Sequence, residues 1–206
     1  LQKRSYLSKT KHEGQTFALK NSFDNLGSIL TFILTGILTT TIALSTDPKP
    51  LTPALVTLTC ITLIPQGLSI YLHRSQKTTD RFIMVRQQRT PFYLATMASV
   101  GVGALLLNFF IPTTVEVQAI LNIALATVCI VALINLKVKI SIHALISCTF
   151  ALVMPHYLPA PLVTFPLFIA MWALTVWSRK FLNRHSDPEL VLGTIAGVLV
   201  SEIYLL

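Results

Sequence analysis

Apolar residues along this chain fall into long blocks separated by short polar segments. Seven blocks reach or approach the roughly 20 residues that a helix needs to cross a bilayer. The blocks are 26–46, 51–72, 91–111, 115–136, 140–158, 161–177 and 190–206. The last three are short or interrupted. Prolines lie in or between the fifth and sixth blocks, at Pro155, Pro159, Pro161 and Pro166. Proline is tolerated in membrane helices because neighbouring groups satisfy the carbonyls that it frees.

The pattern therefore predicts an all-α fold, a polytopic membrane helix bundle with six to seven transmembrane helices. A polar, basic amino-terminal segment (1–25) precedes a single transmembrane domain (26–206). Composition agrees, since 53% of the residues are hydrophobic and 12% are charged, whereas a soluble domain carries about 25% charged residues. The cysteines Cys60, Cys129 and Cys148 lie inside apolar blocks without metal-ligand spacing, so we expect free thiols that act as small hydrophobic side chains.

The basic residues are concentrated on one side of the predicted bundle. With seven crossings, the side that holds the amino terminus also receives 73–90, 137–139 and 178–189. Of the 16 lysines and arginines, Lys49 is the one expected on the opposite side. The positive-inside rule makes the basic side cytoplasmic in an integral, multi-pass membrane protein. Charges in short loops do not form the long stripe that nucleic acid requires. The simplest alternative is that they only orient the chain and contact lipid headgroups.

The first basic cluster is "DRFIMVRQQRTPFYL", residues 80–94, before the third block. Arg86 and Arg89 are three positions apart, so one helical turn places them on the same face. Arg81 adds a third guanidinium, a group that can donate two hydrogen bonds to one phosphate. Pro91 suits the start of a helix.

Two further clusters contain histidines. "KVKISIHA", residues 137–144, places Lys139, Ser141 and His143 at the mouth of the fifth block. Polar groups this close to an apolar block are costly unless they are paired or used.

The segment "SRKFLNRHSDPELVLG", residues 178–193, contains Arg179, His185 and two carboxylates. Glu189 lies four positions after His185 and could hold one ring nitrogen, and Asp187 is a competing candidate. With two crossings between successive clusters, all three end on the same face of the membrane.

These clusters together resemble the type 2 phosphatidic acid phosphatase superfamily. Its motifs are roughly Lys-x6-Arg-Pro, Pro-Ser-Gly-His and Ser-Arg-x5-His-x3-Asp. "SRKFLNRHSDPE" is similar to the third motif, with glutamate where aspartate is usual. "KISIH" resembles the second, in the form with Lys-Ile-Ser-x-His found in some membrane members. "RQQRTP" keeps the arginine of the first, while its lysine position is occupied by Phe82.

The resemblance implies a membrane enzyme that removes phosphate from a phosphatidate-like lipid, a glycerophospholipid, or an isoprenyl phosphate or diphosphate. It implies that His185 attacks phosphorus and forms a phosphohistidine, that Glu189 orients His185, and that His143 protonates the leaving alkoxide. The side chains expected to bind the phosphate are Arg89, Arg179 and Ser141, with Lys139, Arg86 or Arg81 supplying the charge of the replaced lysine. The family requires no metal or cofactor.

Two other functions fit parts of the pattern. The altered first and second motifs are compatible with a catalytically inactive, phosphatase-like subunit that binds lipid or a partner protein. Intramembrane histidines also occur in small transporters and channels. Against a transporter, the blocks hold few charged residues apart from Glu202, and no inverted repeat is visible.

Overall fold

The computed structural model describes residues 30–31, 33–78 and 85–206, apart from the side chain of Arg86. These residues form helices joined by short connections, and none of them forms a β-strand. Some of these segments follow one another without a break and form one continuous helical rod. The first rod is the apolar helix Ile33–Thr46. The second consists of α2 (Leu51–Thr57), a π-helical stretch (Leu58–Leu63) and α3 (Ile64–Arg74).

The third rod begins as a 3-10 turn (Arg86–Arg89), continues as α4 (Thr90–Leu105) and ends as a π-helical stretch (Leu106–Phe110). The remaining helices are α5 (Val115–Asn135), α6 (Ile142–Val153) with a 3-10 extension (Met154–Tyr157), α7 (Pro161–Phe181) and α8 (Asp187–Leu205). Pro91, as predicted, lies in the first turn of its helix. Pro166 lies inside α7 without ending it.

Five of the described helices are long and apolar enough to cross a membrane: Leu51–Arg74, Gln87–Phe110, Val115–Asn135, Pro161–Phe181 and Asp187–Leu205. Two further apolar helices, Ile33–Thr46 and Ile142–Tyr157, are shorter. The predicted helical fold and the multi-pass membrane character are therefore confirmed. The sixth predicted block was too short. Helix α7 ends at Phe181, four residues past the predicted end at 177.

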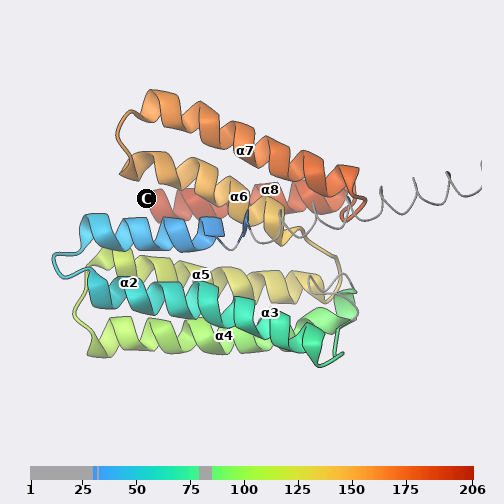
Figure 1. Cartoon of the computed structure of the whole chain (residues 1–206), viewed down its shortest axis with the longest axis horizontal. Helices are drawn as coiled ribbons and strands as arrows, with labels where there is room; N and C mark the ends of the chain where they lie inside the picture. Colours follow the sequence, from blue (N-terminus) through green and yellow to red (C-terminus); the bar gives the residue numbers. More distant parts are fainter. Residues whose placement is uncertain (1–29, 32, 79–84) are drawn as a thin grey trace, which may run out of the picture.

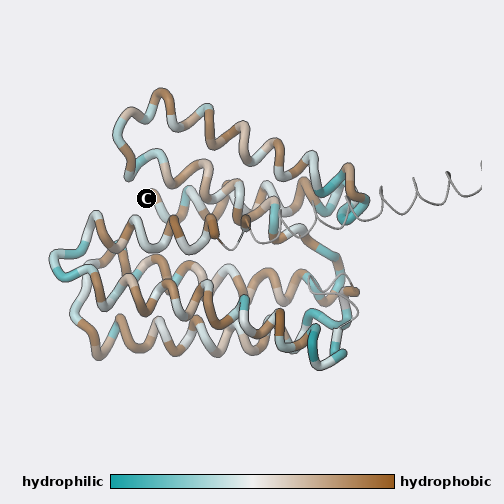
Figure 2. Tube along the Cα trace, in the orientation of Figure 1, coloured by the Kyte–Doolittle hydropathy of each residue, from teal (hydrophilic) through white to brown (hydrophobic). Residues whose placement is uncertain are grey.

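The outer surface of the bundle is apolar. Leu162 is 91% exposed, and Phe109 and Phe110 are each 76% exposed. Water-soluble proteins rarely expose a contiguous apolar surface of this kind. In Figure 2 the hydrophobic residues run along the helices, and the most hydrophilic segments lie at the helix ends. This distribution is the one expected when lipid surrounds the helices.

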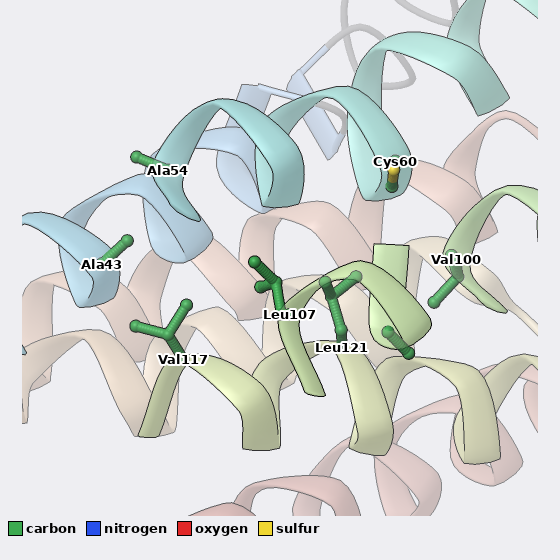
Figure 3. Packing of buried hydrophobic residues seen from close by; sticks show 8 residues of the cluster. Ala43, Ala54, Cys60, Val100, Leu107, Val117 and Leu121 are labelled. Carbon is green, nitrogen blue, oxygen red and sulfur yellow. The ribbon is translucent and has the colours of Figure 1, made fainter. Parts of the chain in front are cut away.

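Small residues pack the first half of the bundle. Ala43, Ala54 and Cys60 face Val100, Leu107 and other members of one cluster across the helix interfaces (Figure 3). A Cβ atom added at Gly103 would lie 2.9 Å from the Sγ and Cβ atoms of Cys60. Such close approach is typical of membrane helices, which associate by van der Waals packing. The cysteines of the described chain are free thiols, as predicted.

Successive helices run in opposite directions (Figure 1). The turn before α4, the α5–α6 connection and the α7–α8 connection consequently lie at the same end of the bundle. That end carries the described parts of all three predicted clusters. We call it the basic end.

Candidate active site

The connection between α7 and α8 has a defined geometry. Helix α7 ends in a Schellman motif, in which the Asn183 N–H donates to the Lys180 carbonyl (2.9 Å) and the Arg184 N–H to the Arg179 carbonyl (3.0 Å). Asn183 has a positive φ of 54°, a conformation that asparagine adopts more readily than most residues. Helix α8 then starts at Asp187, with Pro188 in its first turn. His185 is therefore held between two fixed helix ends.

The two candidate carboxylates near His185 have different partners. The His185 Nδ1 atom lies 2.7 Å from the Glu189 Oε2 atom. Asp187 instead forms an exposed ion pair with Lys180 at 2.9 Å. The predicted contact of His185 with the carboxylate four positions later is confirmed, and the competing assignment to Asp187 is not supported by this geometry. Because a carboxylate only accepts hydrogen bonds, the proton of the neutral ring lies on Nδ1 and the lone pair on Nε2.

Lys139 joins the same group from the α5–α6 connection. Its Nζ atom lies 3.4 Å from the Glu189 Oε2 atom. Its ammonium group also donates to the Arg184 carbonyl at 3.0 Å. Lys139 therefore places a cation beside the His185–Glu189 pair. Of the three residues considered for the missing motif lysine, it is the one whose side chain lies in the described part of the chain.

Close packing of α8 on α6 brings the second and third clusters together. A Cβ atom at Gly193 would collide with the carbonyl oxygen of Ser141, and one at Gly197 would lie 2.7 Å from the Leu145 carbonyl oxygen. The Ser141 N–H also donates to the Glu189 carbonyl at 3.1 Å. The small-xxx-small spacing of these glycines is a known signal for close helix contact. It was available in the sequence, and the motif interpretation overlooked it.

His143 and Arg89 complete the group. The rings of His143 and His185 have centroids 6.3 Å apart and planes inclined at 55°. Arg89 is 7% exposed, and its guanidinium donates to the Ile140 carbonyl at 3.3 Å. Arg179 is 1% exposed. Two histidines and two buried guanidinium groups, from three separate segments, thus gather at the basic end.

Ser141 is fully buried and caps α6, its Oγ accepting from the Ala144 N–H at 3.4 Å. This contact uses an oxygen lone pair and leaves the hydroxyl proton available to another acceptor. Arg81 and Phe82 lie outside the described residues. The backbone of Arg86 belongs to the 3-10 turn, and its side chain is outside the described part.

The surroundings of His185 favour the neutral imidazole. Burial and the positive charges of Lys139, Arg89 and Arg179 lower the pKa of His185 to about 3. Desolvation penalises the charged form of a buried group, and nearby cations act in the same direction. At neutral pH the Nε2 lone pair is therefore available as a nucleophile or base. Among the described residues, histidine, cysteine and carboxylate side chains do not form a group of three or more that could hold a metal ion.

A cavity of about 270 Å³ extends from this group into the bundle. Arg89, His143 and His185 line one end, and Tyr204 and Ile42 belong to the lining at the other. Most of the wall is aliphatic or aromatic. A cavity with such a wall suits hydrocarbon rather than water, because a bound water needs several polar partners.

Comparisons of the chain with models of known protein families, with curated proteins and with solved structures give no match. Function is therefore inferred from the residues of this chain and their arrangement.

Proposed function

We propose that the protein is a membrane phosphatase that hydrolyses a lipid phosphate through a phosphohistidine at His185. The observation that supports this most strongly is the 2.7 Å contact between His185 Nδ1 and the Glu189 carboxylate, beside His143 and buried arginines. An orienting carboxylate, a nucleophilic ring, a second imidazole and phosphate-binding cations are the groups that metal-independent phosphoryl transfer needs. The arrangement also agrees with the resemblance of the three motifs to the type 2 phosphatidic acid phosphatase superfamily.

In the first step the Nε2 lone pair of His185 attacks phosphorus. The N–P bond forms while the ester P–O bond breaks and its electron pair leaves with the alkoxide. His143 gives a proton to that alkoxide, the role that the motif resemblance implies for it. Glu189 keeps the Nδ1 proton in place and stabilises the positive charge that develops on the ring of His185.

The cations hold the phosphate during this step. Guanidinium groups of Arg89 and Arg179 donate to the equatorial oxygens, where charge accumulates. Lys139 and the Ser141 hydroxyl add a point charge and a neutral donor. Arg89, Arg179 and Ser141 are already buried before substrate binds, and Lys139 is held by its contacts with Glu189 and the Arg184 carbonyl, so little reorganisation accompanies the reaction.

In the second step a water molecule attacks the phosphohistidine. The P–N bond breaks, inorganic phosphate leaves, and Nε2 regains its lone pair. His143, now neutral, accepts the proton of the attacking water, so both histidines return to their starting states.

We also assign seven membrane crossings, with the two shorter apolar helices completing the count. The basic end, and with it the active site, then faces the cytoplasm. The support for this orientation is that Lys49 is the described lysine or arginine at the opposite end, whereas the other described ones lie at the basic end.

The direct test is phosphate release by the purified protein in chelator from a panel of lipid phosphates. We expect turnover by the wild-type protein, a loss of at least 10³-fold in His185→Ala and of 10²- to 10⁴-fold in His143→Ala. The control variant is His73→Ala, which removes an exposed histidine in the last turn of α3. Full activity of His185→Ala would exclude the mechanism.

The same assay separates the enzyme from its main alternative. That alternative is a phosphatase-like subunit without activity, which the sequence suggests because Phe82 occupies the lysine position of the first motif. For such a subunit we expect no phosphate release from any lipid in the panel, and no protection of the fold by vanadate.

A further inference from the structure

The apolar cavity has the position of a substrate subsite. Its lining includes Arg89, His143 and His185, so a ligand whose phosphate lies at these residues has its remainder directed into the bundle. Among the described residues, the lining includes members of α3, α4, α5, α6 and α8 and none of α2 or α7. A hydrocarbon chain bound in this way would lie between helices rather than against the outer surface.

The cavity follows the helix axes. On α5, lining residues on one face run from Val131 at the basic end to Ile120 near the opposite end. The corresponding residues on α6 run from Ile142 to Val153. At about 1.5 Å of rise per residue, both stretches are roughly 16 Å long. That length suits an extended hydrocarbon chain of roughly a dozen carbons, since C–C bonds of about 1.5 Å follow a zigzag.

Two tyrosines lie at the far end. Tyr204, near the end of α8, lines the cavity, and its hydroxyl lies 2.9 Å from the hydroxyl of Tyr157. The pair joins α8 to the 3-10 extension of α6. A hydrocarbon chain that reached this point would meet the side chain of Tyr204.

From this geometry we infer that a hydrocarbon chain of the substrate lies in the cavity while its phosphate lies at Arg89, His143 and His185, and that the cavity selects this chain by length. The inference rests on the proposed function and narrows its substrate class. Between the two ends of the cavity the wall is mostly aliphatic or aromatic, which suits hydrocarbon. Ala124, midway along α5, is the small residue at which the channel can be shortened.

The variant Ala124→Phe tests the length selection. Its matched control is Ala126→Phe, which carries the same substitution on the exposed face of the same helix. Phosphate release is measured in nanodiscs from butyl, octyl, dodecyl and hexadecyl phosphate. We expect the ratio of kcat/KM for dodecyl over butyl phosphate to fall at least tenfold in Ala124→Phe and to stay within twofold in Ala126→Phe.

The ratio is insensitive to the fraction of folded enzyme, so partial misfolding does not imitate the expected result. Equal ratios in both variants would overturn the inference.

A second measurement does not require turnover. Dodecyl phosphonate with a diazirine at the chain end is photolysed with His185→Ala protein, and labelled peptides are mapped. Labels near Ile120 and Tyr204 that dodecyl phosphate displaces support the cavity as the chain site, even if no lipid phosphate is hydrolysed. Labels confined to outward-facing residues such as Leu162 would overturn it.

Discussion

At the scale of single residues, the central contact is the one between His185 and Glu189. A carboxylate that fixes the tautomer of a nucleophilic ring affects turnover more than substrate binding. We therefore expect Glu189→Gln to lower kcat by 10²- to 10⁴-fold with a small change in KM. Asp187→Asn is the control, since Asp187 pairs with exposed Lys180 and should leave both constants unchanged. Steady-state kinetics that show equal losses in the two variants would contradict the assignment.

The lowered pKa of His185 should make the stability of the folded protein depend on pH. Its pKa of about 3 in the folded protein lies below the ordinary value of 6.5, so the unfolded chain binds more protons between these limits. Stability is therefore complete above pH 6.5 and falls as pH decreases towards 3. For this group alone the loss between pH 7.5 and 5 is about 2 kcal/mol.

This pH effect is measurable by comparing thermal unfolding of wild type and His185→Asn in detergent at both pH values. The variant should lose less stability on acidification than wild type. An identical pH dependence in both proteins would show that His185 is not buried in its neutral form.

The residues also show what sequence spacing can and cannot predict. The i, i+4 spacing of His185 and Glu189 predicted their contact, because α8 begins between them and supplies the required helical turn. The burial of Arg179 was not predictable, since it depends on the neighbours that other helices bring to the end of α7. Arg81 remains a sequence-based candidate.

At the scale of helices, the contact of α8 with α6 determines whether the site forms. A Cβ atom at Gly193 would overlap the Ser141 carbonyl oxygen and approach the Ala144 Cβ to 3.0 Å, so the helices must separate. We expect Gly193→Ala to destabilise the protein by about 1–3 kcal/mol and to lower phosphatase activity at least tenfold by moving Glu189 and His185 away from His143.

Gly101→Ala is the matched control, because its added methyl would meet only Leu125 Cδ1, at 3.9 Å. This change should be neutral or slightly stabilising, since alanine favours helix. Thermal unfolding and phosphate release of both variants provide the measurement. If Gly193→Ala and Gly101→Ala had the same unfolding temperature and the same rate of phosphate release, the close α6–α8 contact would not position the site.

Helix positions were largely predictable because continuous apolar blocks with polar ends leave few alternatives. The first and last residues of each helix were less predictable than its existence. Helix α7 extends to Phe181, past its apolar block, and this added turn contains the buried Arg179 and the exposed Lys180. The cavity was not predictable, since it depends on which faces of several helices meet.

At the scale of the whole molecule, the proposed seven crossings place the basic end and the opposite end on different sides of the membrane. With Cys60, Cys129 and Cys148 replaced by alanine, single cysteines at Lys77 and Lys137 should react with an impermeant maleimide only from the cytoplasm. A cysteine at Lys49 should react only from the other side. Reaction of all three from one side would contradict the crossing count, and the reverse pattern would contradict the orientation.

The central claim is that His185 carries the phosphoryl group during turnover. Wild-type protein is mixed with a lipid phosphate that it hydrolyses, and the reaction is quenched in base within milliseconds. The protein is then digested, and phosphopeptides are mapped by mass spectrometry. The account predicts an acid-labile, base-stable phosphoryl group on His185 that is absent from the His185→Ala variant. Phosphate release at the wild-type rate by His185→Ala, with no phosphoryl group on histidine in either protein, would contradict it.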